Sequence, residues 1–231
     1  MEILHIRNIS VEVEWKNIKN IHLTLYPPDA RIHISAPVSM TKEAVRLFVI
    51  SKQQWINQRV EMIKSQSRQT QREYVSGENH YFKGIRYRLN VFIHNAPPCV
   101  TLSGTRYINL QVREGSNTTK RAEIMKEWYR NELKQVIAPL IEKWEELLTI
   151  NVNHWEIKQM KTQWGSCNHN AKRIIFNLEL IKKPTHCIEY IVLHEMLHLI
   201  ERLHTSRYIA LLDIHMPNWR NIKNELNEFI V

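Results

Sequence analysis

The sequence predicts an α+β protein, in which groups of strands and long helices follow one another along the chain. Apolar and polar residues alternate within residues 1–35 and again within 81–112, a period of two that is typical of half-buried strands. Within 41–65 and 119–148 the apolar residues instead recur every three or four positions, which indicates amphipathic helices. Strands and helices arranged in such blocks favour an α+β fold.

A domain boundary is expected at EGSNTT, residues 114–119, because clusters of small polar residues are typical of loops. We therefore predict two domains. A strand-rich N-terminal domain with one long helix covers residues 1–113, and a second domain covers residues 119–231. No internal sequence repeat is evident.

The first domain is expected to hold two groups of strands around one helix. The first group is predicted at 9–15, 21–26 and 31–35, and the second at 81–93, 99–103 and 107–112. Thr41 can cap the helix over 41–65, because its hydroxyl can accept from the first backbone N–H groups. Gly84 and Gly104 are expected at turns, because a chain with five glycines uses them where the backbone needs their freedom.

The second domain begins with the helix over 119–148, which Pro139 is expected to kink or break. A hairpin is predicted next. Its arms are 154–164 and 173–181, joined by a turn at 167–172. Pro184 and Thr185 then open another helix, and two shorter helices are expected over 205–213 and 218–229.

Composition limits the class of protein. No apolar run reaches the roughly 18–20 residues that a membrane helix needs, and the N-terminus has no small-residue cleavage site. Three widely spaced cysteines argue against a disulfide framework. We therefore expect a cytoplasmic protein without a membrane partner. The net charge of +9 favours anionic partners, although an ordinary basic surface explains it as well.

The segment YIVLHEMLHLIERLHTS, residues 190–206, carries the strongest chemical pattern. His194, Glu195 and His198 form H-E-x-x-H, and a spacing of four residues is about 1.1 helical turns. Both imidazoles therefore project from one helix face and can reach one metal ion. Glu195 can reach a metal-bound water without being a ligand, and can accept its proton as a general base.

Chance is the alternative explanation of this motif, because the chain has 12 histidines and 23 acidic residues. The helix, however, is apolar nearly all round and is therefore expected to be buried. Buried polar side chains need partners. A metal ion would satisfy the two histidines, so metal binding is the favoured interpretation.

His204 is a candidate third ligand, six residues after His198. On a continuous helix it would lie about 240° round and about 9 Å further along, facing away from the metal. It can coordinate only if the helix ends first and the chain turns back. Glu201 occupies the position where the related motif H-E-x-x-H-x-x-G-x-x-H has glycine, so we expect a strained turn. The competing third ligands are acids further along the chain: Asp213, Glu225 and Glu228.

Taken together, these segments resemble the YgjP-like metallopeptidase-domain family. The resemblance is carried by W-G-S-C at 164–167, by Asn177 and Leu180, by Pro184, by H-E-x-x-H and by the third histidine. It extends to the N-terminal half, where residues 16–56 are similar to the family's strand-rich opening and its Lys-x-x-Trp-Ile helix. The family is a bacterial group of zincin-type proteins, distantly related to the SprT-like and WLM families.

The resemblance implies a zincin-like metalloprotease domain with one Zn²⁺ per chain. It implies that His194, His198 and His204 are the zinc ligands and that Glu195 is the general base. Two departures bear on the turn after the helix. The chain has Leu203 where the family usually has Asn, and Tyr208-Ile209 where it usually has an aromatic pair.

Four further residues are candidates for substrate binding. Trp164 and Gly165 precede the metal helix at the end of a predicted strand, where backbone can approach substrate, although a tight turn under a packed Trp is equally consistent. The resemblance suggests that the strand over 173–181 lines the cleft and pairs with an extended peptide. Asn177 is then a candidate substrate contact, or else a turn hydrogen bond. Arg207 is a candidate anion-binding residue, or else a surface arginine.

The favoured function is a zinc-dependent metallohydrolase, most simply a metallopeptidase. An alternative is a metal-dependent nucleoside triphosphate pyrophosphatase, because some family members are described as pyrophosphatases and the positive charge suits a phosphate substrate. Convergence of Lys and Arg on the cleft would favour nucleotides, and an apolar cleft with an open strand edge would favour peptides. A DNA-associated protease of the SprT-like kind ranks third, because no basic platform with interleaved aromatic residues is evident. No partner protein can be inferred.

Overall fold

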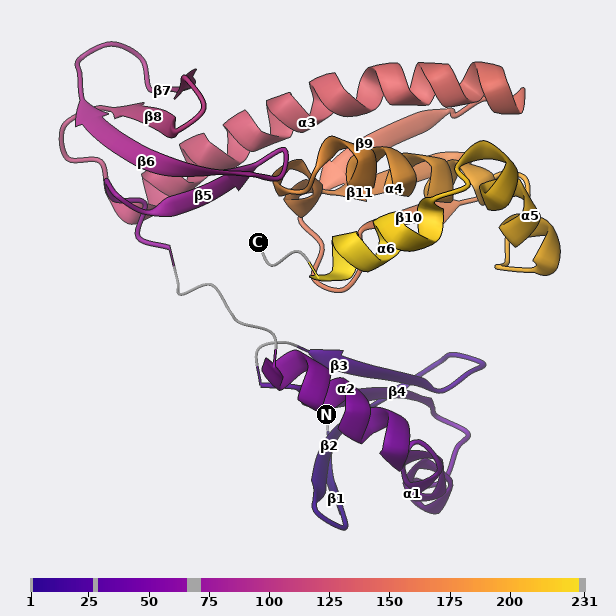
Figure 1. The fold of residues 1–231 in the computed structure, drawn as a ribbon. Helices are drawn as coiled ribbons and strands as arrows, with labels where there is room; N and C mark the ends of the chain where they lie inside the picture. The colour runs from indigo at the N-terminus through magenta and orange to yellow at the C-terminus, as the bar shows by residue number, and fades with distance from the viewer. Residues whose placement is uncertain (1, 27–28, 66–71, 229–231) are drawn as a thin grey trace. The chain divides into compact units, whose positions relative to one another are not determined.

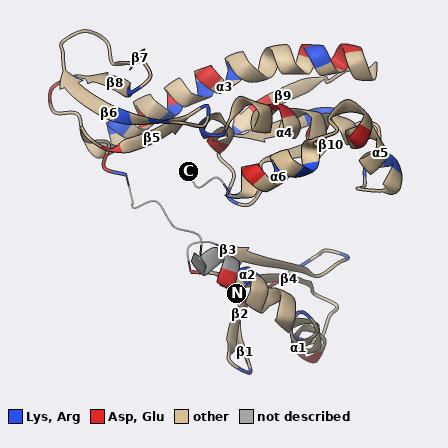
Figure 2. Ribbon diagram, in the orientation of Figure 1, with Lys and Arg blue, Asp and Glu red and all other residues tan. Residues whose placement is uncertain are grey.

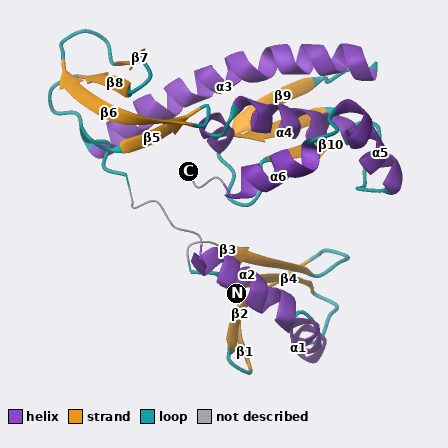
Figure 3. Cartoon of the chain, viewed as in Figure 1, coloured by secondary structure: helices purple, strands orange, loops and turns teal. Residues whose placement is uncertain are grey.

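The computed structural model describes residues 2–26, 29–65 and 72–228, apart from the side chains of 62–65 and 228. Helices and mixed sheets are combined as the predicted α+β class requires (Figures 1 and 3). The chain forms two compact units, Met1–Arg68 and Gln69–Val231. In the described part of the chain, no helix has both the length and the apolar character of a membrane-crossing segment.

The first unit contains a four-stranded sheet in the order β1-β2-β4-β3. Its strands are β1 (Glu2–Ile6), β2 (Ile9–Lys16), β3 (His22–Tyr26) and β4 (Arg31–Pro37). Strands β2 and β4 pair in parallel, and the two outer pairs are antiparallel. The sequence predicted β2, β3 and β4 but not β1.

Two helices follow where the sequence predicted one. They are α1 (Lys42–Ser51) and α2 (Gln53–Ser65), and the break falls at Lys52, the C-terminal cap of α1. Thr41 caps α1 as expected, because its hydroxyl accepts a hydrogen bond from the Ala44 N–H at 3.2 Å. Alternate residues of β2 and β4 bury their side chains against Val45, Val49 and Ile56 of the helices, which gives this unit a core of its own.

The second unit begins with a sheet of the same topology. Its strands are β5 (Asn79–Phe82), β6 (Ile85–Ile93), β7 (Cys99–Ser103) and β8 (Tyr107–Val112), in the order β5-β6-β8-β7. Here β6 and β8 form the parallel pair. Gly84, in the turn between β5 and β6, and Gly104, in the turn between β7 and β8, both have positive φ, in agreement with the prediction.

The division of the chain differs from the predicted boundary at 114–119. Buried residues of β5, β6 and β8 belong to the same hydrophobic core as α3 (Thr118–Leu148) and the elements after it. Tyr129 of α3, for example, donates its hydroxyl proton to the Tyr81 carbonyl in β5 at 3.0 Å. The second strand group therefore packs with the C-terminal part, and the structural boundary lies near residue 68.

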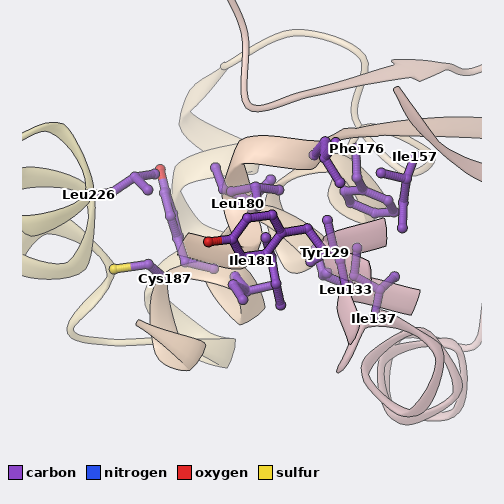
Figure 4. Packing of buried hydrophobic residues seen from close by; sticks show 14 of the residues in the cluster. Tyr129, Leu133, Ile137, Ile157, Phe176, Leu180, Ile181, Cys187 and Leu226 are labelled. Carbon is purple, nitrogen blue, oxygen red and sulfur yellow. The ribbon is translucent and has the colours of Figure 1, made fainter. Parts of the chain in front are cut away.

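Helix α3 runs without a break through Pro139, although the sequence predicted a kink or an end there. Its buried face holds the helix in place: Met125, Tyr129, Leu133, Ile137, Ile141 and Trp144. Figure 4 shows the side chain of Tyr129 packed beside those of Leu180 and Ile181, which belong to the same hydrophobic core. Tertiary packing of this face can offset the hydrogen bond that Pro139 cannot make.

The predicted hairpin is present at its turn but not in its first arm. The antiparallel partner of β11 (Arg173–Asn177) is β10 (Gly165–Asn168), whereas β9 (His154–Lys158) pairs with the other side of β11 in parallel. The sheet order is β10-β11-β9, so β11 is central and β10 is an edge strand. The expectation that the strand over 173–181 forms the open edge is therefore wrong, and its last residues form a 3₁₀ helix, η1 (Leu178–Lys182).

Three helices complete the second unit: α4 (Thr185–Leu197), α5 (Ser206–His215) and α6 (Trp219–Glu228). The motif helix α4 is buried, as its apolar sequence predicts. It packs against β10 on one side and α6 on another. This arrangement places the strand edge, α4 and α6 around one region of the unit (Figure 1).

Candidate metal centre and active site

Helix α4 ends before the third histidine of the motif. Its last residue is Leu197, and His198 is the C-terminal cap. Backbone bonds from Ile200 N–H and Glu201 N–H to the Leu197 carbonyl, at 2.9 and 2.8 Å, then turn the chain back. None of residues 198–205 has positive φ, so the expected strain is not found. The turn requires no glycine, because each residue stays in ordinary backbone conformations.

The turn brings the three imidazoles of the motif together. The Nε2 atoms of His194 and His204 lie 3.2 Å apart. One ring nitrogen from each of His194, His198 and His204 lies within 4.8 Å of the others. The ring centroids of His198 and His204 are 4.7 Å apart. The sequence alone could not decide whether His204 turns toward the pair, and the structure shows that it does.

Two of the acidic residues that competed with His204 have other partners. Asp213 accepts hydrogen bonds from the Trp219 indole at 2.8 Å and from Arg220 at 2.5 Å. Glu225 pairs with His186 at 2.7 Å. The side chain of Glu228 lies outside the described residues.

The three histidines suit a zinc ion. Bonds of about 2.0–2.1 Å in tetrahedral geometry place two nitrogen ligands about 3.3 Å apart. The 3.2 Å between His194 and His204 agrees with that spacing. At this distance one neutral ring, as its Nε2–H tautomer, can donate to the Nε2 lone pair of the other, and two rings whose Nε2 lone pairs are both free can share a cation. Three nitrogen donors would leave a fourth position open, which is the pattern of catalytic rather than structural zinc sites.

Neighbouring groups fix the orientation of the rings. His198 Nδ1 lies 3.2 Å from the Glu201 carbonyl, to which it can donate, so Nε2 is free to face the cluster. Tyr208, which is fully buried, lies over the His198 ring at 4.9 Å and donates to the His194 carbonyl at 3.1 Å. That carbonyl belongs to the last turn of α4, where helical acceptors lack backbone partners. His194 Nδ1 is buried and has no partner among the described groups.

Burial sets the protonation states of the site. It lowers the pKa of His194 to about 3, with smaller contributions from the nearby His198, His204 and Lys223, so the imidazole is neutral as a metal ligand must be. Burial also lowers the pKa of His204. Glu195 is 5% exposed, and burial raises its pKa to about 8. A carboxylate with such a raised pKa can take and return a proton near neutral pH.

Gly165 provides the space for the Glu195 side chain. A Cβ atom at position 165 would lie 2.6 Å from both Cγ and Oε1 of Glu195. The backbone of β10 can therefore approach the carboxylate only because residue 165 has no side chain. The sequence suggested either contact with substrate or a tight turn for this glycine, and the close approach to Glu195 is a third role.

A cavity of about 890 Å³ contains these groups. Helix α4 contributes His194 and Glu195, and all four residues of the edge strand β10 line the cavity as well. Helix α6 contributes Lys223, Leu226 and Asn227. The candidate metal centre therefore lies in a cavity bordered by an open strand edge and a helix.

The other predicted site residues divide into two groups. Trp164 lines the cavity, and the Lys183 ammonium lies 4.9 Å from the centre of its ring. Asn177 is 4% exposed and is absent from the cavity lining. Its amide donates to the carbonyls of Met160 and Gln163, at 3.1 and 2.8 Å, so it holds the preceding loop. Arg207 is exposed and does not line the cavity.

Sequence reasoning missed three residues of this region. Arg202 and Lys223 line the cavity, and Tyr208 packs beneath the histidines. The position of Arg202 between His198 and His204 was a usable signal, because the loop that joins two ligands must border their site. Lys223 lies 19 positions beyond His204, and no local pattern marks it.

Comparison with known proteins agrees with the motif. The family model described as YgjP-like, metallopeptidase domain, matches residues 19–229 and thus both structural units. A search of curated proteins gives no match.

Proposed function

This chain belongs to the YgjP-like metallopeptidase family, and we propose that it is a zinc-dependent peptidase. His194, His198 and His204 hold the ion, and Glu195 is the general base. The observation that carries the proposal is the convergence of three imidazole nitrogens within 4.8 Å beside a buried carboxylate in one cavity. A metallopeptidase family implies a divalent metal, and the all-nitrogen donor set favours zinc.

The chain's own residues account for the proton transfers. Zinc bound by the three histidines would supply Lewis-acid chemistry that activates water and polarises the scissile carbonyl. Glu195 accepts the proton of the attacking water and then gives it to the leaving amine nitrogen. Its raised pKa suits both steps, and Gly165 keeps the carboxylate against β10. Tyr208 and the Glu201 carbonyl hold the rings of the ligands in place.

The edge strand β10 is the proposed substrate-binding element. Among the strands of the described residues, none pairs with its outer side, and its residues border the cavity. An extended peptide can add to such an edge through backbone hydrogen bonds. The peptide backbone would then run past Glu195, with Trp164 at one end of the strand.

The test compares the zinc-loaded protein with Glu195→Gln on unfolded protein and on a panel of nucleotides. We expect peptide-bond cleavage by the wild type and a loss of at least 10²-fold in the variant, with unchanged zinc content, because removing a general base typically costs 10²–10⁴-fold, on the order of 3–5 kcal/mol. Equal behaviour of the two proteins on every substrate would refute the proposal. Elemental analysis of His198→Ala tests the metal site separately, and zinc retained at one ion per chain would count against the proposed ligands.

A second candidate function, hydrolysis of nucleoside triphosphates, has one observation in its favour. Arg202 and Lys223 both line the cavity, and the chain carries a net charge of +9. Cations beside a metal centre suit phosphate groups. The open edge of β10 favours peptide, and the nucleotide panel decides between the two activities in the same experiment.

The DNA-associated alternative gains no support from the charge distribution on α3. Figure 2 shows blue and red segments alternating along this helix, and its sequence mixes lysine, arginine and glutamate. Such alternation does not form the basic stripe that a DNA backbone requires.

A further inference from the structure

Helix α6 contributes a charged group to the cavity that the proposed mechanism does not yet use. Lys223 lines the cavity that holds His194, Glu195 and His204. Its positive charge also lowers the pKa of both His194 and His204. Arg202, from the loop between His198 and His204, lines the same cavity.

Lys223 has no carboxylate partner among the described side chains. It is exposed, and its ammonium lies 5.8 Å from the centre of the Trp219 ring. Arg220, on the same helix, is instead paired with Asp213. Lys223 is therefore available to bind a ligand, whereas Arg220 is already paired with a carboxylate.

A lysine at this position does not stabilise the metal centre. Like charges repel, so an ammonium group beside a divalent cation opposes metal binding, and it also opposes protonation of the histidines. Its long side chain could reach water on the outer surface at no electrostatic cost. The favourable interaction that would offset this repulsion is one with an anion that enters the cavity with the substrate or forms during the reaction.

We propose that Lys223 is a catalytic residue that binds the negatively charged oxygen formed on the attacked group of the substrate. The inference rests on the proposed hydrolytic function. The relevant geometry is that α6 borders the cavity together with β10 and α4, so that Lys223 and the substrate-binding edge face the same metal centre. A substrate carbonyl held at β10 would then have Glu195 and Lys223 within the same cavity.

The electron flow defines what Lys223 would do. When the water oxygen bonds to the carbonyl carbon, the π electron pair of the C=O bond moves to the carbonyl oxygen, and Glu195 takes the water proton. The oxygen now carries a full negative charge, and an N–H of the Lys223 ammonium donates to it. When the C–N bond breaks, the pair returns to form C=O, and the amine nitrogen takes the proton from Glu195. Lys223 keeps its own protons throughout.

Tyr190 is the competing donor. It also lines the cavity, and its ring centre lies 5.8 Å from that of His194. Its ring stacks on Trp219 with an interplanar angle of 10°, and it is 3% exposed, so packing alone accounts for its position. Lys223 carries a full charge and has no such structural role, which favours it over Tyr190 as the residue that meets a developing anion.

The kinetic test compares Lys223→Met, Lys223→Arg and Tyr190→Phe, with Lys134→Met as the control. Lys134 is an exposed lysine on α3 outside the cavity lining. Loss of one oxyanion donor typically lowers kcat about 10²–10³-fold. We expect this loss in Lys223→Met with KM within a few-fold, partial recovery in Lys223→Arg, and wild-type rates in Lys134→Met. A kcat of Lys223→Met within about threefold of wild type, or the large loss in Tyr190→Phe instead, would overturn the proposal.

A binding measurement separates this inference from the proposed function. Calorimetry with a phosphinic peptide, an anionic tetrahedral analogue of the attacked peptide bond, reads the anion site without turnover. We expect Lys223→Met to weaken binding of this analogue at least 10²-fold. Binding of the uncleaved peptide is measured in the inactive Glu195→Gln protein, and adding Lys223→Met to that variant should change this binding little. If wild type and Glu195→Gln prove equally inactive but the analogue still depends on Lys223, the hydrolytic function fails and the anion site stands.

A different outcome would overturn the role of Lys223 and leave the peptidase function in place. If Glu195→Gln abolishes cleavage while Lys223→Met binds the analogue as tightly as wild type, the peptidase stands and Lys223 has no role in it. Zinc content and thermal unfolding are measured for each variant. A loss of zinc in Lys223→Met would assign its effect to the metal site and would also overturn the proposal, because removing a nearby positive charge is expected to retain or strengthen metal binding.

Discussion

At the residue scale, the close approach of Gly165 to Glu195 makes the position of the proposed catalytic carboxylate depend on the backbone at residue 165. Gly165→Ala would place a Cβ atom 2.6 Å from Glu195 Cγ, and Glu195 has little free space because it is buried. We expect the carboxylate to be displaced and kcat to fall on the order of 10²-fold, since small misplacements of a reacting group have effects of that size. Steady-state kinetics at equal zinc content checks this prediction.

A double variant provides the control for Gly165. If the effect of Gly165→Ala acts through the carboxylate, it should produce no further loss in a Glu195→Gln background. Additive losses in the double variant would show that Gly165 acts elsewhere, for example on substrate bound at β10.

Tyr208 links the turn of the motif to the end of α4. Its hydroxyl donates to the His194 carbonyl, and its ring lies on His198. Tyr208→Phe keeps the ring and removes the donor. We expect zinc affinity to fall about 10–100-fold, as is usual when groups that orient ligands are changed, and stability to fall by about 1 kcal/mol. Competition with a zinc-binding dye measures the first effect, and unchanged affinity would limit Tyr208 to packing.

At the element scale, β5 places a histidine inside the second unit. His80 is 1% exposed, and burial, aided by the charges of Arg72 and Lys182, lowers its pKa to about 4, although Glu78 at 3.3 Å acts in the opposite direction. The folded form therefore stays unprotonated between pH 6.5 and about 4, whereas the unfolded chain binds a proton there. Stability is full above pH 6.5 and declines as the pH falls toward 4.

This shift corresponds to about 3 kcal/mol of stability lost across that interval. Denaturant unfolding of the metal-free protein between pH 7 and 4 measures it. His80→Gln, which does not titrate, should show a flatter pH dependence than the wild type over the same range. Parallel pH profiles of the two proteins would contradict the burial argument for His80.

The elements of the site were predictable to different degrees. Helix α4 could be located from its apolar run, and the strands β6 and β8 from their alternation, because local period reports which face is buried. The strands that pair with β11 could not be predicted in this way. Both β9 and β10 precede β11 in the chain. The sequence predicted a simple hairpin between residues 154–164 and 173–181, whereas β11 pairs with β10 on one side and β9 on the other. Pairing depends on contacts that β11 makes on both sides, which local sequence does not encode.

At the scale of the whole molecule, two strand modules share one topology. Strands β1–β4 and β5–β8 each form an outer antiparallel pair, a central parallel pair and a second antiparallel pair, although no sequence repeat is evident. The buried cores of the two units have no residue in common. Only the second module shares its core with α3 and α4, so it supports the candidate active site from within the same unit.

Separate cores predict that the second unit holds metal by itself. A fragment that begins at Gln69 keeps every candidate ligand and every residue of the larger core. We expect it to fold and to bind one zinc ion per chain with an affinity within a few-fold of the full chain. Elemental analysis and calorimetry of the fragment test this. A fragment that folds but binds zinc far more weakly would show that the first unit contributes to the metal centre.

The sequence by itself determined the fold class and located the candidate ligands and the candidate general base on one helix. The spacing of His194 and His198 on one helix, the glutamate between them and the alternation of the strands are local patterns, and helix and strand periods translate them directly into faces. The tertiary structure decided that His204 turns back to the pair, that Gly165 makes room for Glu195, and that Lys223 reaches the cavity from α6. These depend on how distant segments pack, and packing is a property of the whole core.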